Sequence, residues 1–171
     1  MISPVQIHSA NIIEIKTGKE NLENCDGIFT SAENNYSLGI KTADCAAICF
    51  HDGKKYGIVH AGWRGLVNGI VEKMVYHFDK PTIFVSPILK EFEIQKDQCW
   101  EQIQHKFDTK FFKITENKQI IFQFQKALKS ILPQDAIFDE KDTRENKNLA
   151  SWRRDKNAQR NYTVISNKEV L

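Results

Sequence analysis

Residues 46–65 read AAICFHDGKKYGIVHAGWRG, and this stretch decides the fold. Two apolar runs, Ala46–Phe50 and Tyr56–His60, flank the turn His51–Lys54. The Asp-Gly pair in that turn is a strong hairpin signal, because glycine accepts the positive φ that a tight turn requires. After the second run, glycines let the backbone bend sharply, and the apolar residues then recur at helical spacing. The stretch predicts a β-hairpin that leads directly into a helix.

The helix is expected to begin near Gly65 and to end before Pro81. Its apolar face consists of Val67, Ile70, Val71, Met74, Val75 and Phe78.

Further short apolar runs bounded by polar or glycine-containing sequence predict more strands, and two later patterns predict helices. The expected strands are Ile12–Ile15, Gly27–Thr30, Ser37–Thr42, Thr82–Val85 and Tyr162–Ile165, and the expected helices are Gln98–Phe107 and Ile120–Leu132. Strands outnumber helices and often follow one another directly. This pattern favours an α+β fold over an alternating, doubly wound sheet.

The composition is that of an ordinary globular chain of 171 residues, which we expect to form a single domain over residues 1–171. With 24 basic and 22 acidic side chains and a formal net charge of +2, the charge gives no case for a nucleic-acid partner. The sequence has neither an apolar run of membrane-spanning length nor a leader-like N-terminus, so no membrane partner and a cytoplasmic location are expected. The four cysteines are expected to be reduced thiols.

Two segments carry side chains that are capable of chemistry. In Thr42–Cys45 a thiol follows a carboxylate at the end of a predicted strand, and in His60–Gly65 an imidazole precedes a glycine-containing turn into a helix. The helix N-terminus and Arg64 together suggest an anion site. The plain alternative is a buried cysteine, a hydrogen-bonded histidine and a tight turn.

These two segments together resemble the signature of the YfiH family, whose members were labelled multicopper polyphenol oxidoreductases (laccases) and are now regarded as purine nucleoside phosphorylases. Three more segments resemble family motifs over nearly the whole chain: Val5–Ser9 with its histidine, Cys25–Thr30 with Asp26, and Ser151–Asp155 followed by Arg160. The chain departs from the family pattern in beginning almost at the first motif, and also at Ser86–Ile88, Asp142-Thr143 and Gln159.

The resemblance implies a metal site with His8, Cys45 and His60 as ligands, and an α/β/β/α sandwich of mixed sheets related to the CNF toxin fold. One thiolate and two imidazoles suit zinc, with a fourth position left open. Copper is less favoured, because a multicopper oxidase needs many more histidines than the five present. Asp44 and Asp26 are expected to orient an imidazole or a bound water.

The resemblance further implies phosphorolysis of adenosine, inosine or guanosine to free base and ribose 1-phosphate, with adenosine deamination in some members. The partners are then small molecules, with Cys45, His60, Arg64 and Asp44 as catalytic residues; Arg153 or Arg154 is the alternative phosphate ligand.

Two other functions stay open. The first is a metal-free cysteine hydrolase or deamidase, as in toxin deamidases or peptidoglycan-precursor editing, with Cys45 as nucleophile and His60 as base. The second is a shortened paralogue that binds zinc without turnover. His8 distinguishes the zinc enzyme from the hydrolase, because zinc needs this histidine as a third ligand and a cysteine hydrolase does not need it.

The remaining reactive side chains have ordinary interpretations. Cys49 could share the face of Cys45, but a buried thiol is the more common role. Trp63 either stacks on a purine or packs in its turn. The others are expected to be packing or solvated side chains: Cys25, Cys99, His51, His77 and His105.

Overall fold

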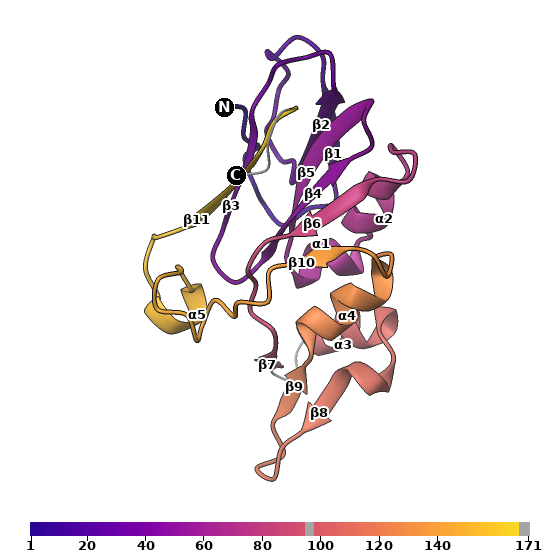
Figure 1. Ribbon diagram of the computed structural model, residues 1–171. Helices are drawn as coiled ribbons and strands as arrows, with labels where there is room; N and C mark the ends of the chain where they lie inside the picture. The colour runs from indigo at the N-terminus through magenta and orange to yellow at the C-terminus, as the bar shows by residue number, and fades with distance from the viewer. Residues whose placement is uncertain (95–97, 168–171) are drawn as a thin grey trace.

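The computed structural model describes residues 1–94 and 98–167, and its centre is a six-stranded mixed sheet (Figure 1). The strand order is β1-β2-β5-β4-β6-β10, in which the edge strands β1 and β10 run parallel to their neighbours and the inner pairs are antiparallel. The bounds are β1 Ile12–Ile15, β2 Gly27–Ser31, β4 Ala46–His51, β5 Lys55–Ala61, β6 Thr82–Val85 and β10 Ile137–Phe138.

The predicted hairpin is confirmed as β4 and β5, which form the middle of this sheet. Gly53 has a φ of 85°, and the Asp52 carboxylate accepts the backbone N–H groups of Lys54 and Lys55. The turn therefore uses both residues of the Asp-Gly pair, one for its backbone freedom and one for its acceptor.

The expected single helix after the hairpin is two short helices, α1 Trp63–Val67 and α2 Ile70–Val75. Gly69 adopts a left-handed φ of 76° and donates its N–H to the Leu66 carbonyl, which ends α1 and turns the chain. The apolar spacing continues across the break, so Leu66, Ile70 and Met74 are all fully buried against the sheet.

A two-stranded antiparallel sheet of β3 Leu38–Thr42 and β11 Asn161–Ile165 covers the opposite face. Side chains from both sheets form a second core, in which Ile40 packs with Ile28 and Ile58. Figure 1 shows the resulting order of helices, large sheet and small sheet, with α5 Trp152–Asp155 near the start of β11. The α+β class with mixed sheets is confirmed.

The remaining elements lie below β10 in Figure 1 and include a three-stranded sheet of order β7-β9-β8. Their bounds are β7 Phe92–Ile94, α3 Gln98–Lys106, a 3₁₀ turn Thr109–Phe111, β8 Phe112–Ile114, β9 Ile120–Phe122 and α4 Phe124–Ile131. The prediction of one helix over Ile120–Leu132 is wrong in its first turn. Residues 120–122 pair with β7 and β8 instead, and Phe122 is fully buried among other phenylalanines.

None of the helices in the described residues has the length and apolar character needed to span a membrane.

Gly57 in β5 tests the packing between the central strands. A Cβ atom there lies 2.6 Å from Phe29 Cβ and 2.9 Å from the Ile28 carbonyl oxygen, so Gly57→Ala forces backbone to move. We expect a loss of about 1–3 kcal/mol in the free energy of unfolding, measured by urea denaturation. In the control Gly39→Ala, the three atoms nearest to the new Cβ all belong to the side chain of the exposed Met1, which can move aside, so the stability should stay within about 0.5 kcal/mol. Equal losses in the two variants would contradict this packing.

Candidate metal centre

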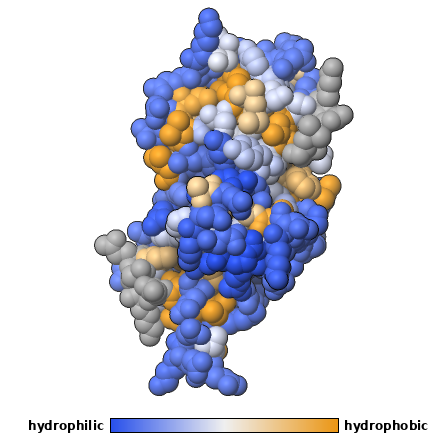
Figure 2. All heavy atoms as spheres, turned by 90° about the vertical axis from the view of Figure 1, so that its left-hand side faces the viewer, coloured by the Kyte–Doolittle hydropathy of each residue, from blue (hydrophilic) through white to orange (hydrophobic). Residues whose placement is uncertain are grey.

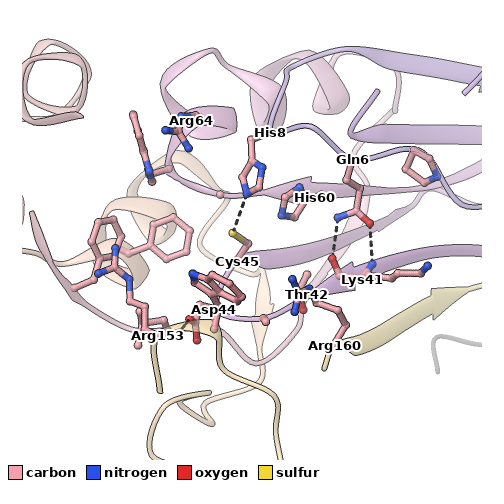
Figure 3. Close-up of a pocket in the computed structure, with 18 of the residues that line it drawn as sticks. Gln6, His8, Lys41, Thr42, Asp44, Cys45, His60, Arg64, Arg153 and Arg160 are labelled. Carbon is pink, nitrogen blue, oxygen red and sulfur yellow. Dashed lines mark hydrogen bonds between the residues drawn. The ribbon is translucent and has the colours of Figure 1, made fainter. Parts of the chain in front are cut away.

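His8, Cys45 and His60 meet at one end of the large sheet, although they come from three separate segments (Figure 3). One ligand atom from each lies within 4.8 Å of the others, and Cys45 Sγ is 3.9 Å from His8 Nε2. The two imidazole rings have centroids 4.6 Å apart and stand edge to face. The structure thus brings together the three side chains that the resemblance groups.

The fully buried carboxylate of Asp26 holds both histidines. Its Oδ1 lies 2.7 Å from His60 Nδ1 and accepts the backbone N–H of His8. Its Oδ2 accepts the backbone N–H groups of Ile7 and Ser9 and the Ser9 hydroxyl. Burial alone raises the pKa of Asp26, but the hydrogen bonds from His60, Ser9 and Ile7 outweigh it and lower the pKa to about 2. Since Nδ1 of His60 is used by Asp26, Nε2 is the nitrogen available to a ligand.

Charge coupling within the cluster favours a thiolate. Burial alone raises the pKa of Cys45, but hydrogen bonds and charge from His60 and His8 lower it to about 6. Burial likewise lowers the pKa of His60, yet Asp26 and Cys45 raise it to about 9. A thiolate is the form of cysteine that binds metals and attacks electrophiles.

The cluster needs a residue without a side chain at Gly62, because Cys45 and His8 occupy the space next to it. The backbone of Gly62 is extended, with φ −86° and ψ 177°, so another residue could adopt it, but a Cβ atom there lies 2.9 Å from Cys45 Sγ and 3.1 Å from His8 Cδ2.

The donor set and spacing fit a tetrahedral metal ion. A metal ion with Zn–S and Zn–N bonds of ordinary length separates sulfur and nitrogen by about 3.5 Å, close to the 3.9 Å between Cys45 and His8.

The cluster lies in the wall of a cavity of about 730 Å³. Four of its lining residues are cationic (Lys41, Arg64, Arg153, Arg160) and four are aromatic (Trp63, Phe92, Phe124, Trp152). The Arg64 guanidinium lies 4.6 Å from the Trp63 ring centroid, and that of Arg153 lies 4.3 Å from the centroid of Phe92. Because α1 has only five residues, the expectation of an anion site rests on the guanidinium of Arg64 and not on a helix terminus, and it stays a prediction.

Asp44 has a different environment from the one expected. Its φ is 89°, and its oxygens accept the Thr143 hydroxyl and the backbone N–H of Arg153, both at 2.8 Å. Asp44 thus ties the C-terminal segment to the bend between β3 and β4 that carries Cys45, while Asp26 contacts the imidazole of His60. A catalytic role for Asp44 stays a prediction.

The two arginines of the C-terminal motif have separate surroundings. Arg154 donates to the carbonyl oxygens of Thr143, Arg144, Asn146 and Leu149 and pairs with Asp155. Its guanidinium is therefore committed to holding a loop, which leaves Arg153 as the member that faces the cavity.

The other reactive residues lie outside the cluster. Cys49 is buried in the second core, where desolvation raises its pKa to about 12, and Cys25 is fully buried there as well. His51 accepts the Gly53 N–H in its turn, and His77 stacks on Phe29. Sequence reasoning missed the contacts of Ser9, Gly62 and Thr143. Only the motifs that contain Ser9 and Gly62 gave any signal.

Residues 1–168 match the model of the family described as multi-copper polyphenol oxidoreductase laccase. The chain belongs to this family. A solved structure of a hypothetical Bacillus licheniformis protein, YfiH, superposes with a TM-score of 0.83 at 19% identity over 96% of this chain and 73% of that one. A Neisseria meningitidis protein of the DUF152 family gives the same values. These likenesses confirm the YfiH fold.

Two curated relatives are named purine nucleoside phosphorylases. The protein from Aquifex aeolicus is 29% identical over 171 residues, which cover 95% of this chain and 80% of that protein. The protein from Haemophilus influenzae is 36% identical over 75 residues. That match covers 43% of this chain and 30% of the relative, so the shared segment spans less than a third of its length.

Gly62→Ala tests whether the cluster is a metal centre. The new methyl group displaces Cys45 Sγ or His8, so we expect cobalt(II) to bind about tenfold more weakly or worse. The measurement is a titration followed by the thiolate-to-cobalt absorption band. Gly65→Ala, in the same turn, is the control, because its Cβ meets Ile70 at 3.2 Å and neither ligand atom. Unchanged cobalt affinity in Gly62→Ala would exclude a centre built on these atoms.

Proposed function

We propose that this YfiH-family protein is a zinc-dependent purine nucleoside phosphorylase that also deaminates adenosine. The observation that carries the proposal is the position of the His8–Cys45–His60 cluster in the wall of a cavity that is lined by arginines and by aromatic rings. The names of the Aquifex and Haemophilus relatives support a nucleoside as the substrate.

The donor set favours zinc over the copper of the family description. One thiolate and two imidazoles are common zinc ligands. Of the five histidines, only His8 and His60 belong to the cluster found in the described residues, whereas several copper ions need many more. When bound, zinc supplies a Lewis acid and an open coordination position.

The side chains of the cavity suit a purine nucleoside and phosphate. Aromatic rings such as Trp63 and Phe92 offer stacking surfaces to a purine, and Arg64 and Arg153 offer guanidinium groups to a phosphate dianion. In phosphorolysis a phosphate oxygen bonds to C1′ of the ribose while the bond from C1′ to the base nitrogen breaks. The bonding electron pair leaves with the base, which takes up a proton. Fixing the anion beside C1′ is the contribution expected of the arginines.

A cysteine hydrolase is the second candidate, and the position of His60 between Asp26 and Cys45 favours it. Asp26, His60 and Cys45 form a series of carboxylate, imidazole and thiol that resembles a nucleophilic triad. His8 has no role in that chemistry, so its effect on activity separates the two functions.

Metal analysis and a phosphate-dependent assay with adenosine test the proposal. We expect about one equivalent of zinc per chain in the wild-type protein. His8→Ala and Cys45→Ser should lose this zinc on purification, and turnover with it, and should keep only a weaker residual affinity for added zinc. Cys49→Ser is the matched control, because it lies in the core: it should keep zinc and activity and lose roughly 1–3 kcal/mol of stability. Full activity in metal-free His8→Ala would contradict the zinc-dependent function and leave the cysteine hydrolase as the favoured candidate. Zinc without turnover in the wild-type protein would indicate a binding paralogue.

Arg64→Met should raise the apparent KM for phosphate about tenfold or more, because a charge-assisted contact to the anion is lost. Zinc content and the KM for the nucleoside should stay the same. Steady-state kinetics with each substrate varied in turn measure both constants. If only the nucleoside KM rises, Arg153 becomes the phosphate ligand, and Arg153→Met should then show the phosphate effect.

A further inference from the structure

The side chain of Gln6 is bound to the backbone of β3 as a strand would be. Its Nε2 donates to the Lys41 carbonyl oxygen at 2.8 Å, and its Oε1 accepts the Lys41 N–H at 3.0 Å (Figure 3). β3 pairs with β11 along its other edge, where Lys41 lies opposite Tyr162. The amide of Gln6 therefore supplies both hydrogen bonds that Lys41 would make to a neighbouring strand.

The N-terminal segment follows this edge of β3. Ile2 donates to the Ser37 carbonyl oxygen and accepts the Gly39 N–H, forming a parallel bridge opposite Leu38. Gln6 continues the same ladder through its side chain, which frees the backbone to turn away from β3 towards Asp26. Two residues later the chain reaches His8.

His8 itself has a left-handed backbone, with φ 64°. Such a conformation is unfavourable for a residue with a Cβ and persists only where the surroundings fix it. Asp26 holds the backbone N–H groups of residues 7–9, and Gln6 anchors the preceding turn to β3. The histidine is thus held from two sides: from the large sheet through Asp26, and from the small sheet through Gln6.

We propose that Gln6 is a positioning residue for the metal centre, acting through the placement of His8. This inference rests on the proposed function in taking zinc as the metal. Gln6 touches neither metal nor substrate; its backbone-like pairing with Lys41 keeps the imidazole of His8 within reach of Cys45.

The experiment measures the zinc affinity of the full-length protein by competition with a chromophoric chelator. Gln6→Met keeps the length of the side chain and removes both hydrogen bonds, and Gln6→Glu keeps the acceptor and removes the donor. We expect both variants to bind zinc about tenfold more weakly or worse. Gln104→Glu, on the exposed side of α3, controls for the added charge and should match the wild type.

A double-mutant cycle separates positioning of His8 from a general loosening of β3. In a His8→Ala background, Gln6→Met should leave the residual zinc affinity unchanged, because the ligand through which it acts is gone. An equal loss in both backgrounds, or wild-type affinity in the single variants, overturns the inference alone. A wild-type protein that takes up no zinc overturns the proposed function as well.

Discussion

The buried carboxylate of Asp26 accepts hydrogen bonds from an imidazole of β5 and from three consecutive backbone N–H groups around His8. Burying a carboxylate without hydrogen-bond donors costs free energy, so Asp26 can occupy this position only because these donors surround it. Together with a fifth contact, from the Ser9 hydroxyl, these hydrogen bonds fix one ring nitrogen of His60 and the backbone of the segment that carries His8. Both histidines therefore take their places from one side chain, and Cys45 completes the cluster from the bend that directly precedes β4.

The architecture around Asp26 explains why the cluster opens into a cavity. The β4–β5 hairpin brings Cys45, directly before β4, and His60 in β5 to one end of the large sheet (Figure 1). Lys41 and Thr42, at the end of β3, line the cavity beside them. Asp44 ties the C-terminal segment to this end through Thr143 and Arg153. Figure 2 shows mostly polar residues across the middle of one face, with apolar residues on either side. The cationic side chains of the cavity come from segments far apart in sequence.

The sequence predicted the parts that local chemistry determines. The Asp-Gly turn marked the hairpin, and the short motifs marked the segments that meet in the cluster. The break at Gly69 escaped prediction because the apolar spacing of Leu66, Ile70 and Met74 is continuous across it. The expected helix included residues 120–122 because a short apolar run has no decisive period, and one of their two partner strands, β7, lies far away in the sequence. The contact of Asp44 with Thr143 spans 99 positions, which no local pattern reports.

X-ray absorption spectroscopy at the zinc edge, on the full chain loaded with one equivalent of zinc, tests the central claim most directly. A centre made of Cys45, His8 and His60 predicts one sulfur at about 2.3 Å and two imidazole nitrogens at about 2.0–2.1 Å, with a fourth light ligand. Cys45→Ser should remove the sulfur shell, whereas Cys49→Ser should leave it intact. A zinc shell without sulfur in the wild-type protein, or one that survives the loss of Cys45, would contradict the account.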